Sequence, residues 1–162
     1  MNALLDSAHT WFFESSSHEL GGALVVRLVE GIKAPERQHV DVGETTLGPY
    51  FPVRVEPHSR CVEVRFENAV TFLVVNESYD TKDPEMIRGV GRFLFVATSS
   101  SFRKFTVERT LLTQLCEEPY EEYLLWCEDR LFRILATATP KITLLEEPPN
   151  LSLERTETWS AN

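Results

Sequence analysis

Carboxylate side chains come in adjacent pairs at the start of the last third of the chain. Glu117 and Glu118 precede Pro119, and Glu121 and Glu122 follow it, at an expected junction between a helix and a strand. Two neighbouring carboxyl groups can perform general acid–base catalysis when a cleft separates their pKa values. A junction of this kind normally faces water, so the pattern favours a solvated acidic rim over a catalytic pair.

The other residue types that could do covalent chemistry lack the surroundings that it needs. The serine runs at 15–17 and 99–101 have none of the glycines of a Gly-x-Ser-x-Gly turn, and the second run predicts a helix N-cap. Cys116 and Cys127 are each followed by two acidic residues, which disfavour the thiolate of a cysteine nucleophile. We therefore expect no catalytic residue.

Metal and phosphate sites are also not indicated. The four histidines are scattered, with no His-x-His or Cys-x-x-Cys pair. The segment "DTKDPE" (80–85) lacks the central glycine and the final glutamate of a calcium loop, and no glycine pair continues into a phosphate-binding motif. The sequence predicts neither a metal nor a cofactor.

A protein-binding surface is the remaining use for the acidic segment. Aromatic residues lie among its carboxylates, and aromatic anchors with a polar rim are typical of interfaces, although solubility alone would explain the acids equally well. A second polar cluster, "NESYD" (76–80), follows an apolar strand and is either a turn or a recognition loop. The candidate binding residues are Glu117, Glu118, Tyr120, Glu121, Glu122, Tyr123, Asn76, Glu77 and Tyr79.

The charge of the chain limits its partners. The net charge is −9, and residues 117–162 contribute −6 of it through ten acidic and four basic side chains. Such a field repels nucleic acid and anionic lipid, and it speeds association with a basic protein. The first 20 residues do not form a secretory signal, no run is long enough to span a membrane, and the three cysteines read as reduced thiols. We expect a cytoplasmic protein, monomeric or homodimeric.

The hydrophobic pattern predicts an α+β fold with a mainly antiparallel sheet. Apolar residues at helical spacing predict an N-terminal helix over 2–13, and a serine cap predicts a second helix from 101 to about 118. The alternating segment at 61–66, a turn at 67–69 and the apolar segment at 70–75 predict an antiparallel hairpin. The strands expected besides these two lie at 23–32, 39–42, 50–55, 92–98, 122–127, 130–139 and 141–147, the last three forming a C-terminal β-meander. Residues 1–147 should form one domain, followed by a poorly ordered tail at 148–162.

The chain looks like a group of small bacterial proteins over about residues 20–145. The stretches that carry this resemblance are "VVRLVEG", "VEVRFENAVTFLVVNESYD", "SSSFRKF" and "EYLLWCEDRLFRILATATPKI". In its acidity and size the chain also resembles the immunity proteins of bacterial toxin systems. That resemblance implies a non-enzymatic protein that binds and neutralises a basic toxin domain.

Two other hypotheses remain open at this stage. His39, Asp41, His58 and Glu77 lie at expected strand ends and could converge in the pocket of a small enzyme or ligand-binding domain. Alternatively, an exposed edge near "PYFPVRV" (49–55) could let the protein self-associate.

Overall fold

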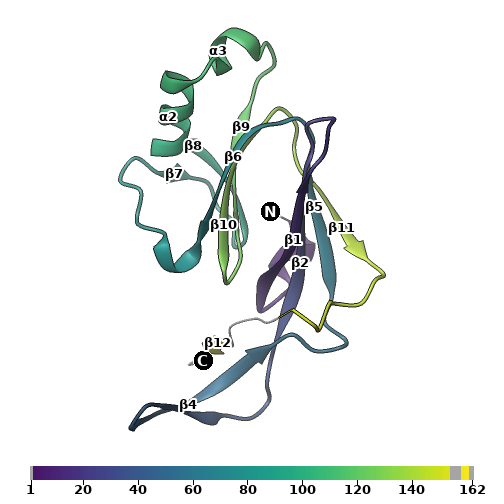
Figure 1. Ribbon diagram of the computed structural model, residues 1–162, viewed down its shortest axis with the longest axis vertical. Coiled ribbons are helices and arrows are strands. Elements are labelled where there is room, and N and C mark those ends of the chain that lie inside the picture. Colours follow the sequence, from purple (N-terminus) through teal and green to yellow (C-terminus); the bar gives the residue numbers. More distant parts are fainter. Residues whose placement is uncertain (1, 154–157, 161–162) are drawn as a thin grey trace.

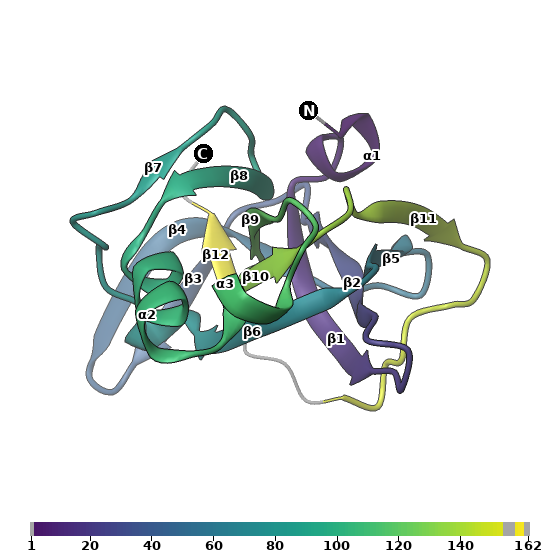
Figure 2. The same ribbon diagram turned by 90° about the horizontal axis from the view of Figure 1, so that it is seen from above.

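The computed structural model describes residues 2–153 and 158–160 and has two antiparallel sheets that enclose a shared core (Figure 1). Seen from above, the five-stranded sheet lies beside the seven-stranded sheet (Figure 2). The helices α2 and α3 lie on the side of the five-stranded sheet that is away from the seven-stranded one (Figure 2). The seven-stranded sheet contains β1 (Thr10–His18), β2 (Leu24–Lys33), β3 (Gln38–Val42), β4 (Thr45–Arg54), β5 (Cys61–Phe66), β11 (Lys141–Leu145) and β12 (Thr158–Ser160). The five-stranded sheet contains, in spatial order, β6 (Ala69–Asn76), β10 (Arg130–Ala136), β9 (Glu121–Trp126), β8 (Leu94–Ser99) and β7 (Ile87–Arg88). The helices are α1 (Ala3–Asp6), α2 (Ser101–Arg109) and α3 (Leu112–Leu115), with a 3₁₀ turn at Glu77–Tyr79. The predicted α+β class with mainly antiparallel strands is confirmed.

β2 is the centre of the larger sheet, as its apolar sequence predicts. It pairs with β1 along one edge and with β5 along the other, and its last two residues pair with β4. Its side chains are buried on much of both faces, which suits a run of β-branched residues. The main core joins both sheets and includes Trp11, Leu24, Val26, Leu28, Val62, Val64, Phe66, Tyr123, Leu125, Phe132 and Ile134.

The predicted hairpin between 61–66 and 70–75 is wrong. β5 pairs with β2 and β11, whereas β6 pairs with β10 in the other sheet. The chain crosses between the layers at a turn in which Asn68 has a φ of 48°, a left-handed value that asparagine tolerates. Alternation predicts that a segment is a strand, but it does not identify the strand with which it pairs.

The predicted N-terminal helix is much shorter than expected. It ends at Asp6, and the chain enters β1 at Thr10, so Trp11 lies in a strand. The Trp11 indole Nε1 donates a buried hydrogen bond of 2.9 Å to the Leu5 carbonyl, and this bond holds α1 against the strand. Pairing with β2 therefore outweighs the helical spacing, and it also keeps the serines at 15–17 in the strand instead of breaking it.

The prediction of a C-terminal β-meander is wrong for its last strand. β9 and β10 form the predicted hairpin, but β11 crosses to the larger sheet and pairs with β5. Pro140 precedes β11, where the chain passes from one sheet to the other. Residues 84 and 85 form a turn before β7.

The segment predicted as one helix from 101 to about 118 contains two shorter helices, of which α2 begins at Ser101. Ser100 is its N-cap, and its Oγ accepts a hydrogen bond of 2.9 Å from the Arg103 N–H. Thr110 interrupts the helix because its Oγ1 donates to the Thr106 carbonyl and accepts from the Leu112 N–H. No helix within the described ranges is long and apolar enough to cross a membrane. Part of the predicted tail, at 154–157 and 161–162, lies outside the described residues.

Candidate binding surface

The acidic segment predicted as one rim is divided by the fold. Glu117, Glu118 and Glu121 are exposed, whereas Glu122 and Tyr123 are buried. The two buried side chains lie on opposite faces of β9, since successive residues of a strand point to opposite sides. Tyr123 faces the core, and its ring centroid lies 5.7 Å from that of Phe66. Glu122 and Tyr123 therefore have no surface to offer a partner.

Glu122 is a fully buried carboxyl group, with 0% exposure. Its two oxygens lie 2.8 and 2.6 Å from the Ser100 Oγ, which can donate to one of them at a time. Burial raises its pKa, against the opposing effects of the Ser100 hydrogen bond and of the Arg133 and Arg103 charges. A carboxyl group without access to solvent or to a pocket has a structural role here.

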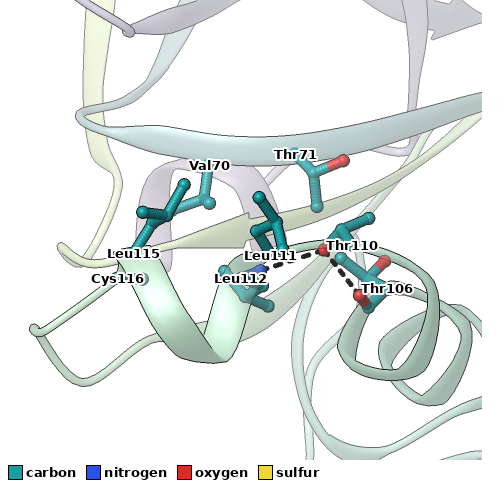
Figure 3. Close-up of a pocket in the computed structure, with 8 residues that line it drawn as sticks. All are labelled: Val70, Thr71, Thr106, Thr110, Leu111, Leu112, Leu115 and Cys116. Carbon is teal, nitrogen blue, oxygen red and sulfur yellow. Dashed lines mark hydrogen bonds between the residues drawn. The ribbon is translucent and has the colours of Figure 1, made fainter.

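An apolar groove lies between β6 and the α2–α3 segment (Figure 3). Val70 and Thr71 extend from β6 on one side, and Leu111 and Leu115 face them from the other. We call it the β6–α3 groove; its volume is about 430 Å³, and Thr106, Thr110, Leu112 and Cys116 complete its lining. Leu111 is 56% exposed and Leu115 is 76% exposed. Both leucines therefore leave apolar surface exposed beside this groove.

Two predicted acidic residues border this groove. An adjoining hollow of about 310 Å³ shares Leu115 and Cys116 with it and is lined by Glu117 and Glu118. These two acidic residues therefore lie next to the exposed Leu115. The sequence pattern did not reveal the groove, because leucines at helical spacing normally predict a buried helix face.

A second pocket, of about 700 Å³, lies on the outer face of the five-stranded sheet. We call it the outer-face pocket. Its floor is apolar and its wall is the 77–92 segment, whose lining side chains carry charges of both signs. The floor residues are Phe95, Leu124, Trp126 and Leu131, and the charged lining residues are Glu77, Asp80, Lys82, Asp83, Arg88, Arg92 and Arg133.

Asp83 fixes the wall of this pocket. It accepts hydrogen bonds from the Ser101 N–H (2.9 Å) and Ser101 Oγ (2.7 Å), and it pairs with Arg133 at 2.7 Å. Burial opposes ionisation of Asp83, but these hydrogen bonds outweigh it and hold its pKa well below the ordinary value of 3.8. Asp83 therefore anchors the wall of the pocket to both α2 and β10.

The "NESYD" cluster forms a turn, and its residues separate. The Asn76 side chain accepts from the Ser78 N–H at 3.0 Å, Glu77 lines the outer-face pocket, and Tyr79 is 81% exposed. Asn76 ends β6 and the β6–α3 groove lies at its start, so the two predicted clusters are roughly 20 Å apart along the strand. β6 connects them.

The four residues of the enzyme hypothesis lie on three separate segments of the chain. His39 and Asp41 are on β3, where the Asp41 carboxylate accepts from Thr46 Oγ1, and His58 is in the turn before β5. Of the four, only Glu77 lines a pocket described above. Across residues 2–153 and 158–160, no three His, Cys, Asp or Glu residues come close enough to hold a metal ion.

The cysteines are free thiols, and two of them are buried. Burial raises the pKa of the Cys127 thiol, and the Asp129 charge adds to this effect. A thiol held in its protonated form is a poor nucleophile.

Comparison with known proteins gives no relative. The chain matches no protein-family model, no curated protein and no solved structure.

Proposed function

We propose that this protein is a non-enzymatic binding domain that recognises a basic protein through the β6–α3 groove and its acidic border. The observation that carries the proposal is that an exposed leucine and two acidic residues lie at one place: Leu115 lines both the groove and the hollow that Glu117 and Glu118 line. The concrete form that fits this chemistry is an immunity protein that neutralises a basic toxin domain.

The charge of the whole chain supports the same partner. A net charge of −9 attracts a basic protein over a distance of about 10 Å at ordinary salt, and the exposed leucines supply the short-range contact after encounter. The acidic side chains should therefore act on the association rate, and the leucines on the dissociation rate.

The test is capture of a basic partner with matched variants of the bait. The wild type is compared with two double variants that each remove two negative charges. Glu117→Gln/Glu118→Gln removes them from the acidic border. The control, Glu36→Gln/Glu44→Gln, removes them at exposed positions beside β3 and β4. We expect the first variant to lower the association rate of the recombinant partner about three- to tenfold at low salt, because each exposed charge pair contributes up to about 1 kcal/mol. The control variant should change the association rate much less. When the protein is co-expressed with a toxic partner, it should rescue the growth of the host cells only if the groove is intact.

An equal loss of association rate in the two variants would assign the binding to net charge, and it would contradict recognition at the β6–α3 groove and its acidic border. An enzyme assay is not needed for this decision. Leu115→Asp adds a second arm, since it leaves Glu117 and Glu118 in place and should speed dissociation.

A second candidate function, the binding of a small ligand, is favoured by the size and anchoring of the outer-face pocket. Its apolar floor includes the exposed Trp126, over which Arg88, Lys82 and Glu77 could hold a ligand that combines a flat apolar body with a charged group. Titration with aromatic acids and amines, followed by tryptophan fluorescence, should show saturable quenching that Trp126→Ala removes. Quenching that persists in the variant would argue against this pocket.

A further inference from the structure

β6 is an edge strand; the Ala69 N–H at its start donates to the Gly22 carbonyl, and the rest of its outer side has no strand beside it among the described residues. It forms a ladder with β10, and within the described part of the chain no strand pairs with its other edge. Alternate backbone N–H and C=O groups of an antiparallel edge strand point away from the sheet and are available to another chain. β6 has eight residues, which is long enough to pair with a segment of ordinary strand length.

The edge has few of the features that normally prevent such pairing. "AVTFLVVN" contains no charged residue and no proline, and its one register irregularity lies at its first residues. Val70, Leu73 and Val74 are exposed along it. The end strand β7 at the other side of the sheet has two residues, so β6 is the long edge of this sheet.

The β6–α3 groove runs beside this edge. Val70 and Thr71 belong to β6 and also line the groove, with Leu111 and Leu115 across from them (Figure 3). A strand added beside β6 would thus have one row of side chains next to these leucines. Its end near the start of β6 would lie close to the hollow lined by Glu117 and Glu118.

We propose that the partner contributes an extended segment that adds to β6 as a sixth strand of this sheet. The segment alternates apolar residues, which enter the β6–α3 groove, with lysine or arginine, which pairs with Glu117 and Glu118. This inference rests on the proposed function and specifies how the partner is held: main-chain hydrogen bonds to β6 supply affinity, and the groove supplies selectivity.

The probe is a capped nine-residue peptide of alternating lysine and valine. Two further versions have the same sequence but carry N-methyl groups on the amides of either the lysines or the valines. Each methylated version loses donors along one edge only, and both keep the charge and the side chains. Binding is measured by amide NMR of the full-length protein, together with hydrogen exchange of residues 70–75.

Strand addition predicts an asymmetric result. The unmethylated peptide should bind and slow the exchange of alternate β6 amides. One methylated version should bind at least tenfold more weakly, because several hydrogen bonds of about 1 kcal/mol each are lost, and the other version should bind as the parent does. The Glu117→Gln/Glu118→Gln variant should weaken all binding without changing this asymmetry.

The alternative outcomes separate the two proposals. Equal binding of all three peptides, lost in the Glu117→Gln/Glu118→Gln variant, would overturn strand addition and leave recognition of a basic partner standing. Asymmetric binding that is unchanged in that variant would support strand addition and count against the acidic border. No binding of the parent peptide, or a peptide-free dimer whose β6 amides are already protected, would overturn the inference.

Discussion

Glu122 shows why a carboxylate cannot be assigned to a surface from its neighbours in sequence. The alternation of β9 correctly predicts that Glu122, Leu124 and Trp126 share one face. It does not predict that the N-terminus of α2 covers the first of them, since Ser100 approaches from a segment 22 positions earlier. A contact of this kind depends on the tertiary fold, and the local pattern contains no trace of it.

The burial of Glu122 predicts a pH dependence of stability. Because its folded pKa is raised above the ordinary value of 4.5, the folded state keeps a proton that the unfolded state releases. The stabilising contribution of this group is therefore complete below pH 4.5 and is lost as the pH rises through the folded pKa. Glu122→Gln cannot ionise and keeps an acceptor for Ser100, so the variant should gain stability relative to wild type as the pH rises.

Urea unfolding at several pH values between 4.5 and 8 measures this difference. Glu121→Gln, at the exposed neighbouring position, is the matched control for the loss of one carboxylate. A difference between Glu122→Gln and wild type that stays constant over the whole range would show that Glu122 ionises in the folded protein as it does in the unfolded chain.

At the scale of the elements, the sequence predicted strands more reliably than their partners. The sequence identified β2, β5, β6, β9 and β10 as strands: β5 by period-two alternation, and β2 by its run of β-branched residues. The pairing of β5 and β6 with strands of different sheets was not predictable, since a two-residue turn can join a hairpin or carry the chain between layers. The same limit explains the misplaced β11. For the binding surface, the sequence located the carboxylates of Glu117 and Glu118 but not the groove beside them.

Gly31 marks a crossing of three strands that leaves no room for a side chain. A Cβ atom there would lie 2.6 Å from the Thr10 Cγ2, 2.7 Å from the Phe12 ring and 2.9 Å from the Val53 Cγ1. Gly31→Ala should therefore lower the free energy of unfolding by about 1–3 kcal/mol, the usual cost of overpacking. Gly21→Ala is the control, because a Cβ at Gly21 has no atom within 4 Å, and it should change stability by less than about 0.5 kcal/mol. Chemical denaturation of both variants decides the point, and equal stabilities would show that β1, β2 and β4 are not closely packed at this position.

At the scale of the molecule, the two sheets share one core. The main hydrophobic cluster contains residues of β1, β2 and β5 together with residues of β9 and β10. Neither sheet could keep its inner face buried without the other. The β3–β4 arm is different: most of its side chains are exposed, and in Figure 1 it extends away from the two layers.

These two observations predict an order of opening that native-state hydrogen exchange can measure. Amides of β2, β5, β9 and β10 should exchange only through global unfolding, with similar free energies in both sheets, because opening either layer exposes the shared core. Amides of β3 and of the first half of β4 should exchange through a smaller local opening, since little apolar surface is exposed when the arm separates. Gly31→Ala should lower the protection of the core strands of both sheets together. If it lowered protection in the seven-stranded sheet alone, the two sheets would be separate cooperative units, and the edge strand β6 would remain intact while the other layer opens.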